Sequence, residues 1–355
     1  MVYSKFDKNL VEKYKQVLYR EMYGEIPPAP EKVLFNIRRQ YLDFAGKVRV
    51  VEFFVRANMA NGETAIFPIN AYFPVNAKKN KTIVYVSREQ AVPHNECPLE
   101  EIIDRGYNLV HYRYDFFVNH SGRLDYENNK ILLKLCPNSG KMAFWIWGLS
   151  RTYEFLSMLD EVDSKNIGIV GNDIAGRIVM AAAAFEDRFA FAHSNCSGTL
   201  GASLFTSMDE NSQPINEAML WYEWALNERF HATTDEHIVG GYHKVDFDVE
   251  LPLSKLGEDF DQHLHGYLIA PRPFSVGCAS EDLLSSPNGT FDFCKAISNA
   301  YESYGVKGLV APEKFAVGER YYDGNVGFYC RKGARFFGRE DWNNLMDFFD
   351  SNLNK

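Results

Sequence analysis

Apolar positions along the chain follow two different periods. A first segment, at about 8–23, carries apolar residues at helical spacing and predicts an amphipathic helix. Apolar and polar residues then alternate with a period of two, which is typical of antiparallel strands at one edge of a sheet. These stretches lie at 32–38, 47–56 and 64–73.

Short apolar runs alternate with longer helical patterns through the rest of the chain. Strands are predicted at 81–86, 107–114, 166–170, 188–194, 273–280 and 326–330. Helices are predicted at 98–105, 141–159, 174–185, 260–269, 291–304 and 340–353. This alternation predicts an α/β fold, with a mostly parallel central sheet flanked by helices in a three-layer sandwich. We expect a single domain over 1–355 with an insertion at about 200–258, because no repeat or low-complexity linker divides the chain.

Charge and composition narrow the classes of partner. The 355 residues carry a formal net charge of -9 and show no lysine or arginine cluster, so neither nucleic acid nor a membrane surface is an expected partner. No apolar segment is long enough to span a bilayer. The N-terminal segment lacks the apolar core of a signal peptide, which predicts a cytoplasmic protein, although a removed leader would leave the same sequence.

The cysteines do not indicate a metal site. Six are present, at 97, 136, 196, 278, 294 and 330, with no C-x-x-C spacing, so we expect buried thiols. Asp235, His237 and His243 lie close together in a polar stretch, but without the spacing of a known metal site we expect surface groups. The sequence therefore predicts no metal and no cofactor.

A glycine-bounded corner lies between the apolar run that ends at Gly171 and an alanine-rich helix. The small residues Ala175 and Gly176 allow that helix to fold back onto the strand, which is the geometry of a nucleophile elbow. The residue at the corner is Asp173, where a hydrolase ordinarily has serine. Aspartate also tolerates the positive φ of such a corner, so Asp173 has a purely structural interpretation as well.

Several segments resemble the glucuronoyl esterases, carbohydrate esterase family 15, over the chain from about Tyr14 to Phe349. They include NIGIVGNDIAGR, DFDQHLHGYLIAPRPF and FYCRKGARFFGREDW, of which the second is the most specific. The resemblance implies an α/β-hydrolase fold. It also implies cleavage of the ester between lignin alcohols and the 4-O-methyl-glucuronate groups of xylan, by a Ser-His-acid triad without metal or cofactor.

Carried over residue by residue, the triad of the family is replaced. Asp173 matches the serine, and Arg335 matches the histidine. The acid position after the strand at 273–280 remains acidic at Glu281 and Asp282. Cys196 stands where some members carry a glutamate instead.

The residues that bind substrate in the family match less closely. Ile174 replaces the arginine that helps hold the oxyanion, whereas Arg177 keeps the positive charge of the lysine that contacts the uronate. Arg177 and Arg335 together could offer guanidinium groups to a carboxylate. The expected ligand is therefore a small molecule, a uronate or another sugar acid.

A hydrolase of this fold needs a histidine after its last strand, and the sequence contains none after His265. The general base is missing, which favours a non-hydrolytic protein. If the fold holds, Asp173 and Arg335 could form an ion pair where nucleophile and base would touch; the simpler alternative is that both face solvent.

Two other functions stay open. Asp173 could act as the nucleophile of a carbohydrate-ester or related hydrolase, if His193, His243 or His263 entered the site from upstream. The fold could instead serve as a scaffold for a protein partner. The oligomeric state and the identity of the ligand do not follow from the sequence.

Overall fold

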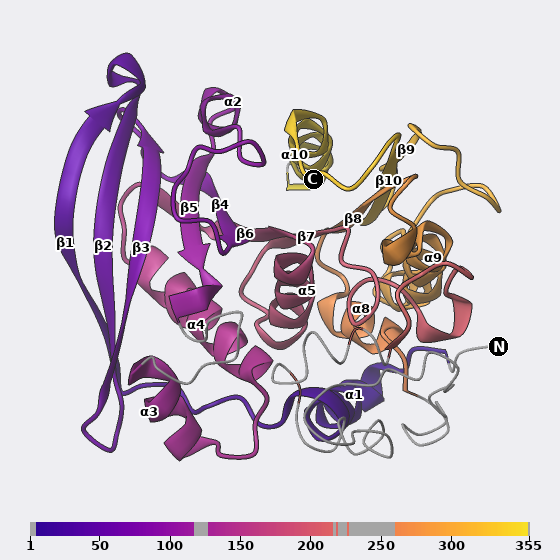
Figure 1. Cartoon of the computed structure of the whole chain (residues 1–355), viewed down its shortest axis with the longest axis horizontal. Helices are drawn as coiled ribbons and strands as arrows, with labels where there is room; N and C mark the ends of the chain where they lie inside the picture. The colour runs from indigo at the N-terminus through magenta and orange to yellow at the C-terminus, as the bar shows by residue number, and fades with distance from the viewer. Residues whose placement is uncertain (1–4, 117–126, 216–217, 219–225, 227–259, 354–355) are drawn as a thin grey trace, which may run out of the picture.

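A computed structural model describes residues 5–116, 127–215, 218, 226 and 260–353. The described strands form one ten-stranded sheet in the order β1-β2-β3-β5-β4-β6-β7-β8-β10-β9 (Figure 1). They are β1 (Lys32–Asp43), β2 (Val48–Asn58), β3 (Thr64–Pro74), β4 (Asn80–Ser87), β5 (Asn108–Arg113), β6 (Val162–Asn172), β7 (Phe191–Asn195), β8 (Phe274–Ala279), β9 (Arg320–Tyr321) and β10 (Val326–Arg331).

The centre of the sheet is parallel and its two edges are antiparallel. All pairings from β5 through β4, β6, β7 and β8 to β10 are parallel. The three period-two stretches form β1, β2 and β3, which pair antiparallel in a meander. The predicted α/β fold with a mostly parallel central sheet is confirmed.

Helices cover both faces of the sheet (Figure 1). One face packs against α2 (Leu99–Asp104) and α10 (Arg339–Leu353), whose apolar side chains share one buried cluster. Five further helices bury their apolar residues in a separate, larger cluster on the other face. These are α1 (Val11–Leu18), α4 (Lys141–Leu156), α5 (Ile174–Phe185), α8 (His263–Ile269) and α9 (Pro287–Ser303). The arrangement has the three layers expected.

A further helix and six short helical turns complete the described elements. Helix α3 (Glu127–Leu135), which the sequence analysis does not predict, lies beside β3. The turns are Lys8–Leu10, Tyr19–Tyr23, Phe44–Gly46, Tyr114–Phe116, Phe205–Ser207 and Leu283–Ser285. Among the described residues, no helix is both long and apolar enough to cross a membrane.

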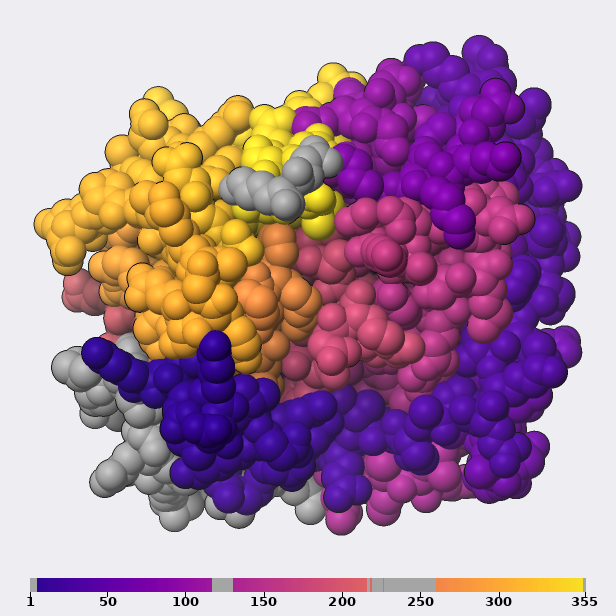
Figure 2. All heavy atoms as spheres, turned by 180° about the vertical axis from the view of Figure 1, so that it is seen from behind, coloured from indigo at the N-terminus to yellow at the C-terminus, as the bar shows by residue number. Residues whose placement is uncertain are grey.

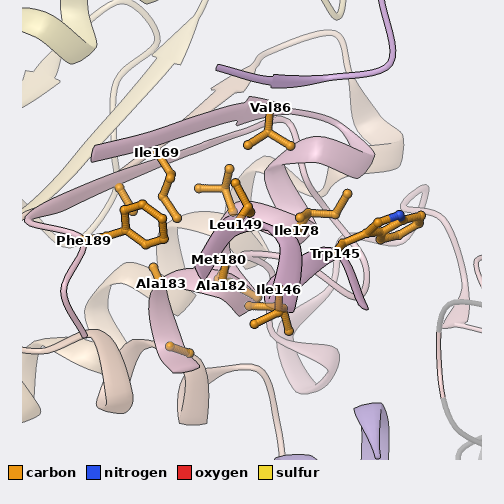
Figure 3. Packing of buried hydrophobic residues seen from close by; sticks show 14 of the residues in the cluster. Val86, Trp145, Ile146, Leu149, Ile169, Ile178, Met180, Ala182, Ala183 and Phe189 are labelled. Atoms are coloured by element: carbon orange, nitrogen blue, oxygen red, sulfur yellow. The ribbon is translucent and has the colours of Figure 1, made fainter. Parts of the chain in front are cut away.

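Helix α5 forms the centre of the larger core. Every residue from Ile174 to Ala184 is buried. Figure 3 shows side chains of α4 and β6 gathered around Met180 and the neighbouring alanines. Alanine side chains are small, so α4 and the sheet approach the α5 backbone closely, and this packing holds the start of α5 rigidly against β6.

The N-terminal segment packs against the C-terminal half of the chain, on the side of the larger core. Its residues run along the side of the molecule seen in Figure 2 and lie against the orange residues of the C-terminal half. The backbone N–H of Phe6 donates to Asn299 Oδ1 at 2.8 Å, and its ring meets that of Tyr267 edge-on at 5.3 Å. Tyr14 and Leu18 of α1 are buried on the same side.

Some boundaries differ from the predicted ones for local reasons. Helix α9 begins at Pro287 rather than at 291, because the Ser286 hydroxyl accepts from the N–H of Gly289 and caps the helix. Strand β7 begins at Phe191 rather than at 188, because Arg188 is held in the preceding turn by the Glu186 carboxylate.

Most of the insertion predicted at about 200–258, including Trp221 and Trp224, lies outside the described residues. The single-domain description therefore stays a prediction.

Candidate active site

The strand-to-helix turn at Asp173 has the conformation of a nucleophile elbow. Asp173 has φ 55° and ψ -119°, and its N–H donates to the Asn195 carbonyl at 2.9 Å. A Cβ on Gly171 would lie 2.4 Å from the Ala175 carbonyl oxygen, and one on Gly176 would lie 2.9 Å from the Asn195 oxygen. Both positions need glycine because backbone atoms fill the space that a side chain would require.

A cavity of about 610 Å³ opens above this elbow. It lies beyond the carboxyl ends of β4 and β6, where open α/β sheets bind their ligands. Its lining combines aromatic, acidic and basic side chains. The lining residues are Tyr85, Val86, Ser87, Arg88, Glu89, His94, Asn95, Glu96, Tyr114, Asn172, Asp173, Ile174, Ala175 and Arg335.

Arg335 joins Asp173 to Asp282 at the edge of the cavity. Its Nε and Nη2 donate to the two carboxylate oxygens of Asp282 at 2.9 and 3.0 Å, and its Nη1 lies 3.3 Å from Asp173 Oδ1. The hydroxyl of Ser285 also donates to Asp282. Burial lowers the pKa of Arg335, but the hydrogen bonds to Asp282 and the charge of Asp173 outweigh it, so the net pKa is raised. The ion pair considered from the sequence is therefore present.

The sequence match to the family pairs these three residues with acid, base and nucleophile, and the structure brings their side chains into contact. Arg335 contacts Asp282 through one side of its guanidinium and Asp173 through another, as a histidine would use its two ring nitrogens. A guanidinium, however, has no lone pair to accept a proton at physiological pH. The network thus joins two carboxylates through a group that cannot act as a base.

The backbone N–H groups at the start of α5 are a polar feature of the cleft, although the side chain of Ile174 is apolar. Ile174 lines the cavity and is 7% exposed. The N–H groups of the first turn of a helix have no partner within that helix, and the N–H after the corner residue is an oxyanion donor in α/β-hydrolases. The backbone at this position therefore retains the capacity to bind an oxygen of a ligand.

Arg177 and Cys196 are buried and do not line the cavity. The guanidinium of Arg177 is buried, with Nε donating to the Ser197 carbonyl at 2.8 Å and Nη2 to Gln213 Oε1 at 3.4 Å. The thiol of Cys196 is 2% exposed, and burial raises its pKa well above the usual value. The structure does not bring these two side chains together with Asp173, Arg335 and Ile174 in the cleft.

Neither described histidine proposed as a recruited base lines the cavity. His193 Nδ1 is 2.7 Å from the Ser275 hydroxyl, and burial lowers the pKa of this imidazole to about 3. His263 packs edge-on to the Tyr267 ring at 4.9 Å, and burial lowers its pKa to about 4. His243, like Asp235 and His237, lies outside the described residues.

Two residues of the cleft escape the sequence analysis. His94 and Glu96 follow β4, and both line the cavity. His94 Nδ1 accepts from the Glu96 N–H at 3.3 Å, and its Nε2 is 3.3 Å from the Tyr85 hydroxyl. Their position could have identified them, because they follow the first central strand and loops at the carboxyl edge of a parallel sheet carry functional residues.

A serine–histidine contact also borders the cleft. Ser87 Oγ lies 2.9 Å from Nε2 of His111, which is 2% exposed. Burial lowers the pKa of His111 to about 3, so this imidazole is neutral and a weak base. We interpret the pair as a satisfied buried hydrogen bond rather than as a nucleophile and its base.

Metal ligands do not gather at this site. Across the ranges that the structure describes, no group of three or more His, Cys, Asp or Glu side chains is arranged to hold a metal ion.

Comparison with known proteins decides the family. The family model described as "Glucuronyl esterase, fungi" matches residues 59–305, which is more than half of the chain. The chain belongs to the glucuronoyl esterase family. The resemblance identified from the sequence is thus confirmed.

Curated relatives of the family align over part of their length. Carbohydrate esterase MZ0003, from an unknown prokaryotic organism, is 28% identical over 215 residues, which are 60% of this chain and 45% of the relative. The 4-O-methyl-glucuronoyl methylesterase of Hypocrea jecorina is 27% identical over 171 residues, which are 48% of this chain and 34% of the relative. The chain thus aligns with less than half of each of these two proteins.

Solved structures show the same fold over nearly the whole chain. A glucuronoyl esterase from Solibacter usitatus superposes with a TM-score of 0.80 at 20% identity, covering 97% of this chain and 92% of that one. A glucuronoyl esterase from Teredinibacter turnerae gives a TM-score of 0.81 at 18% identity, covering 96% and 84% of the two chains. The glucuronoyl esterase family member described here therefore has the α/β-hydrolase fold.

Proposed function

We propose that this member of the glucuronoyl esterase family binds a carbohydrate in the cleft above Asp173 and does not hydrolyse an ester there. The observation that carries the proposal is the position of Arg335 between Asp173 and Asp282. In this proposal the guanidinium takes the place of the base that would receive the nucleophile's proton, and it cannot accept one.

The alternative in which Asp173 attacks an ester is opposed by the same contacts. The ion pair with Arg335 stabilises the carboxylate and lowers its reactivity as a nucleophile. An enzyme ester formed on Asp173 would also need a base to activate the water that releases it. His193 and His263 are buried away from the cleft, so neither of them serves this step.

Carbohydrate binding is supported by the size and lining of the cavity. About 610 Å³ is enough for a small saccharide, and the polar lining offers hydrogen bonds to hydroxyl groups. A glucuronoyl esterase variant from Sporotrichum thermophile, with a TM-score of 0.68 and 19% identity, is described in complex with methyl 4-O-methyl-β-D-glucopyranuronate. That complex belongs to the other protein; for this chain it motivates sugars as the first ligands to test.

The test combines activity and binding on one preparation. Hydrolysis of glucuronate, acetyl and aryl esters is measured for the native protein and for Asp173→Ala, beside thermal-shift binding of monosaccharides and sugar acids. We expect no turnover above buffer and a thermal shift on sugars. Turnover that disappears in Asp173→Ala would contradict the proposal and make Asp173 catalytic, whereas no turnover and no shift would favour a scaffold for a protein partner.

A further inference from the structure

The wall of the cavity carries the imidazole of His94 together with charged side chains. The charged side chains are three carboxylates and two guanidinium groups. They are Glu89, Glu96, Asp173, Arg88 and Arg335. The first question for a sugar ligand is which of these charges are available to it.

Arg335 has little capacity left for an anionic ligand. Two of its nitrogens bind Asp282, and the third faces Asp173. A ligand carboxylate would have to displace Asp173 or share the guanidinium with two existing carboxylates. Like charges brought this close repel each other, so the site disfavours a uronate at this position.

Arg177, the second guanidinium expected to hold a uronate, is 5% exposed and does not line the cavity. Its Nε and Nη2 already donate to Ser197 and Gln213. Among the described residues of the lining, Arg88 is the one remaining arginine that could meet a carboxylate, and the carboxylate of Glu89, the next residue in the chain, offsets its charge.

Glu96 is negatively charged, unlike Arg88, and its half-buried position in the lining favours a nearby cation. Its side chain is half-buried beside the elbow and is hydrogen-bonded to Asn172, whose Oδ1 accepts from Asn195 Nδ2 at 2.9 Å. Burial raises the pKa of Glu96, and the hydrogen bond with Asn172 offsets only part of that effect. Burial removes water that would stabilise the ionised carboxylate. A ligand cation near the carboxylate would stabilise it instead.

From these charges we infer that the cleft prefers an amine-bearing sugar, bound more tightly than its neutral counterpart, and that a uronate binds most weakly. The inference rests on the proposed function, because it names the class of carbohydrate that the same cleft accepts. Glu96 pairs with the amine, and the ring hydroxyls meet the polar groups of the lining.

Three sugars that differ chiefly in one group test this order. Binding of glucosamine, glucose and glucuronate is measured by calorimetry at about pH 7, where an amine with a pKa of about 8 is mostly protonated. We expect glucosamine to bind about 10-fold more tightly than glucose, and glucuronate more weakly than glucose. Raising the salt concentration should reduce the difference between the three.

Glu96→Gln is the decisive variant, because it keeps the shape of the side chain and removes its charge. Glucosamine should lose most of its advantage over glucose in this variant. Glu101→Gln is the matched control: Glu101 lies on α2, pairs with Arg339 at 2.7 Å and is absent from the cavity lining, so its removal should leave the order unchanged.

The possible failures are distinguishable. Tightest binding by glucuronate, or a glucosamine preference unchanged in Glu96→Gln, would overturn the inference and leave carbohydrate binding intact. Absence of binding by all three sugars at millimolar concentration would overturn it as well, and would remove the support for the proposed function itself.

Discussion

Arg335 holds two carboxylates of very different exposure. The side chain of Asp282 is 5% exposed, whereas that of Asp173 is 34% exposed. A charge left alone in the interior costs far more than one that water can reach. The contact with Asp282 therefore contributes most of the stability of the network.

This difference predicts unequal effects of two substitutions. Arg335→Met should lower the free energy of unfolding by about 3 kcal/mol, because it leaves the buried charge of Asp282 without its cationic partner. Asp173→Asn should change it by less than about 1 kcal/mol. Urea denaturation measures both. Arg339→Met, which removes an exposed pair with Glu101, is the control and should cost less than about 0.5 kcal/mol; equal losses in all three variants would contradict the argument.

The position of Asp282 also predicts that esterase chemistry can be restored. In the double variant Asp173→Ser with Arg335→His, a ring nitrogen would take the place of Arg335 Nε against Asp282, and the other ring nitrogen would face the serine. We expect hydrolysis of aryl esters at least about 10²-fold above either single variant, because nucleophile and base act as a unit.

Assays with p-nitrophenyl acetate would compare the double variant with its parents. Adding Asp282→Asn should abolish the gain, since the imidazole would lose the carboxylate that orients it. Equal activity in the double and single variants would show that the positions do not form a working triad, with the side chain of Ile174 beside the oxyanion site as the next group to replace.

Predictability from sequence differs among the residues of the site. The contact between Asp173 and Arg335 was one of the two arrangements that the match to the family's nucleophile and base left open, and the ion pair is present. The burial of Arg177 did not follow from that match, because it depends on how 195–213 folds over the start of α5. The approach of Glu96 to Asn172 joins two loops far apart in the chain, and no local pattern encodes such a contact.

The elbow between β6 and α5 is the element on which the cleft depends, and glycine at 171 makes its close packing possible. Gly171→Ala should destabilise the fold by about 2 kcal/mol, because the new methyl group would meet the Ala175 backbone, which cannot rotate away. Thermal or urea unfolding would measure the loss.

Gly62→Ala provides the comparison. It has φ +84° but nothing within 4 Å of the added Cβ, so it carries only the conformational strain, about 1 kcal/mol. A loss at Gly171 no larger than at Gly62 would mean that the turn relaxes to admit a side chain.

Most elements follow from periodicity, and the exceptions have physical causes. Strand β9 has two residues, Arg320 and Tyr321, which are too few to show any period. Strand β1 continues beyond 38 to Asp43 by pairing with β2, although nearly all its residues are exposed. Edge strands are defined by backbone hydrogen bonds, so a burial pattern cannot reveal their full length.

At the scale of the whole molecule, the net charge of -9 affects solubility and the binding of charged partners, and it does not determine the fold. The expected absence of nucleic-acid and membrane partners, and the cytoplasmic location, stay predictions.

The buried histidines predict that the whole fold is sensitive to acid. Four imidazoles are at most 5% exposed, and burial lowers their pKa values from 6.5 to about 3 or 4. They are His111, His193, His263 and His265. Because their folded pKa values lie below the unfolded ones, the unfolded state binds more protons as the pH falls below 6.5. Their contribution to stability is complete above pH 6.5 and is lost towards pH 4.

Asp341 acts in the opposite direction. Burial raises the pKa of its carboxyl from 3.8 to about 6, with the N–H of Gly338 and the charge of Arg331 opposing that rise only in part. The folded state therefore binds one more proton than the unfolded state between about pH 4 and 6, which adds stability as the pH falls. One such group offsets at most a quarter of the effect of four histidines, and Glu96 and Asp261, whose pKa values burial also raises, act in the same direction as Asp341.

The balance gives a measurable slope. If unfolding takes up four protons, the free energy of unfolding falls by at most about 5 kcal/mol per pH unit, and if it takes up three, by at most about 4 kcal/mol. The total stability of a protein domain is about 5–15 kcal/mol. We expect the free energy of unfolding in urea to fall steeply from pH 6.5 and the protein to unfold before pH 4. His265→Gln should reduce the slope by about one proton, because its imidazole no longer takes up a proton on unfolding. A free energy that stays constant between pH 7 and pH 5 would mean that these imidazoles are already protonated, or reach water, in the folded protein.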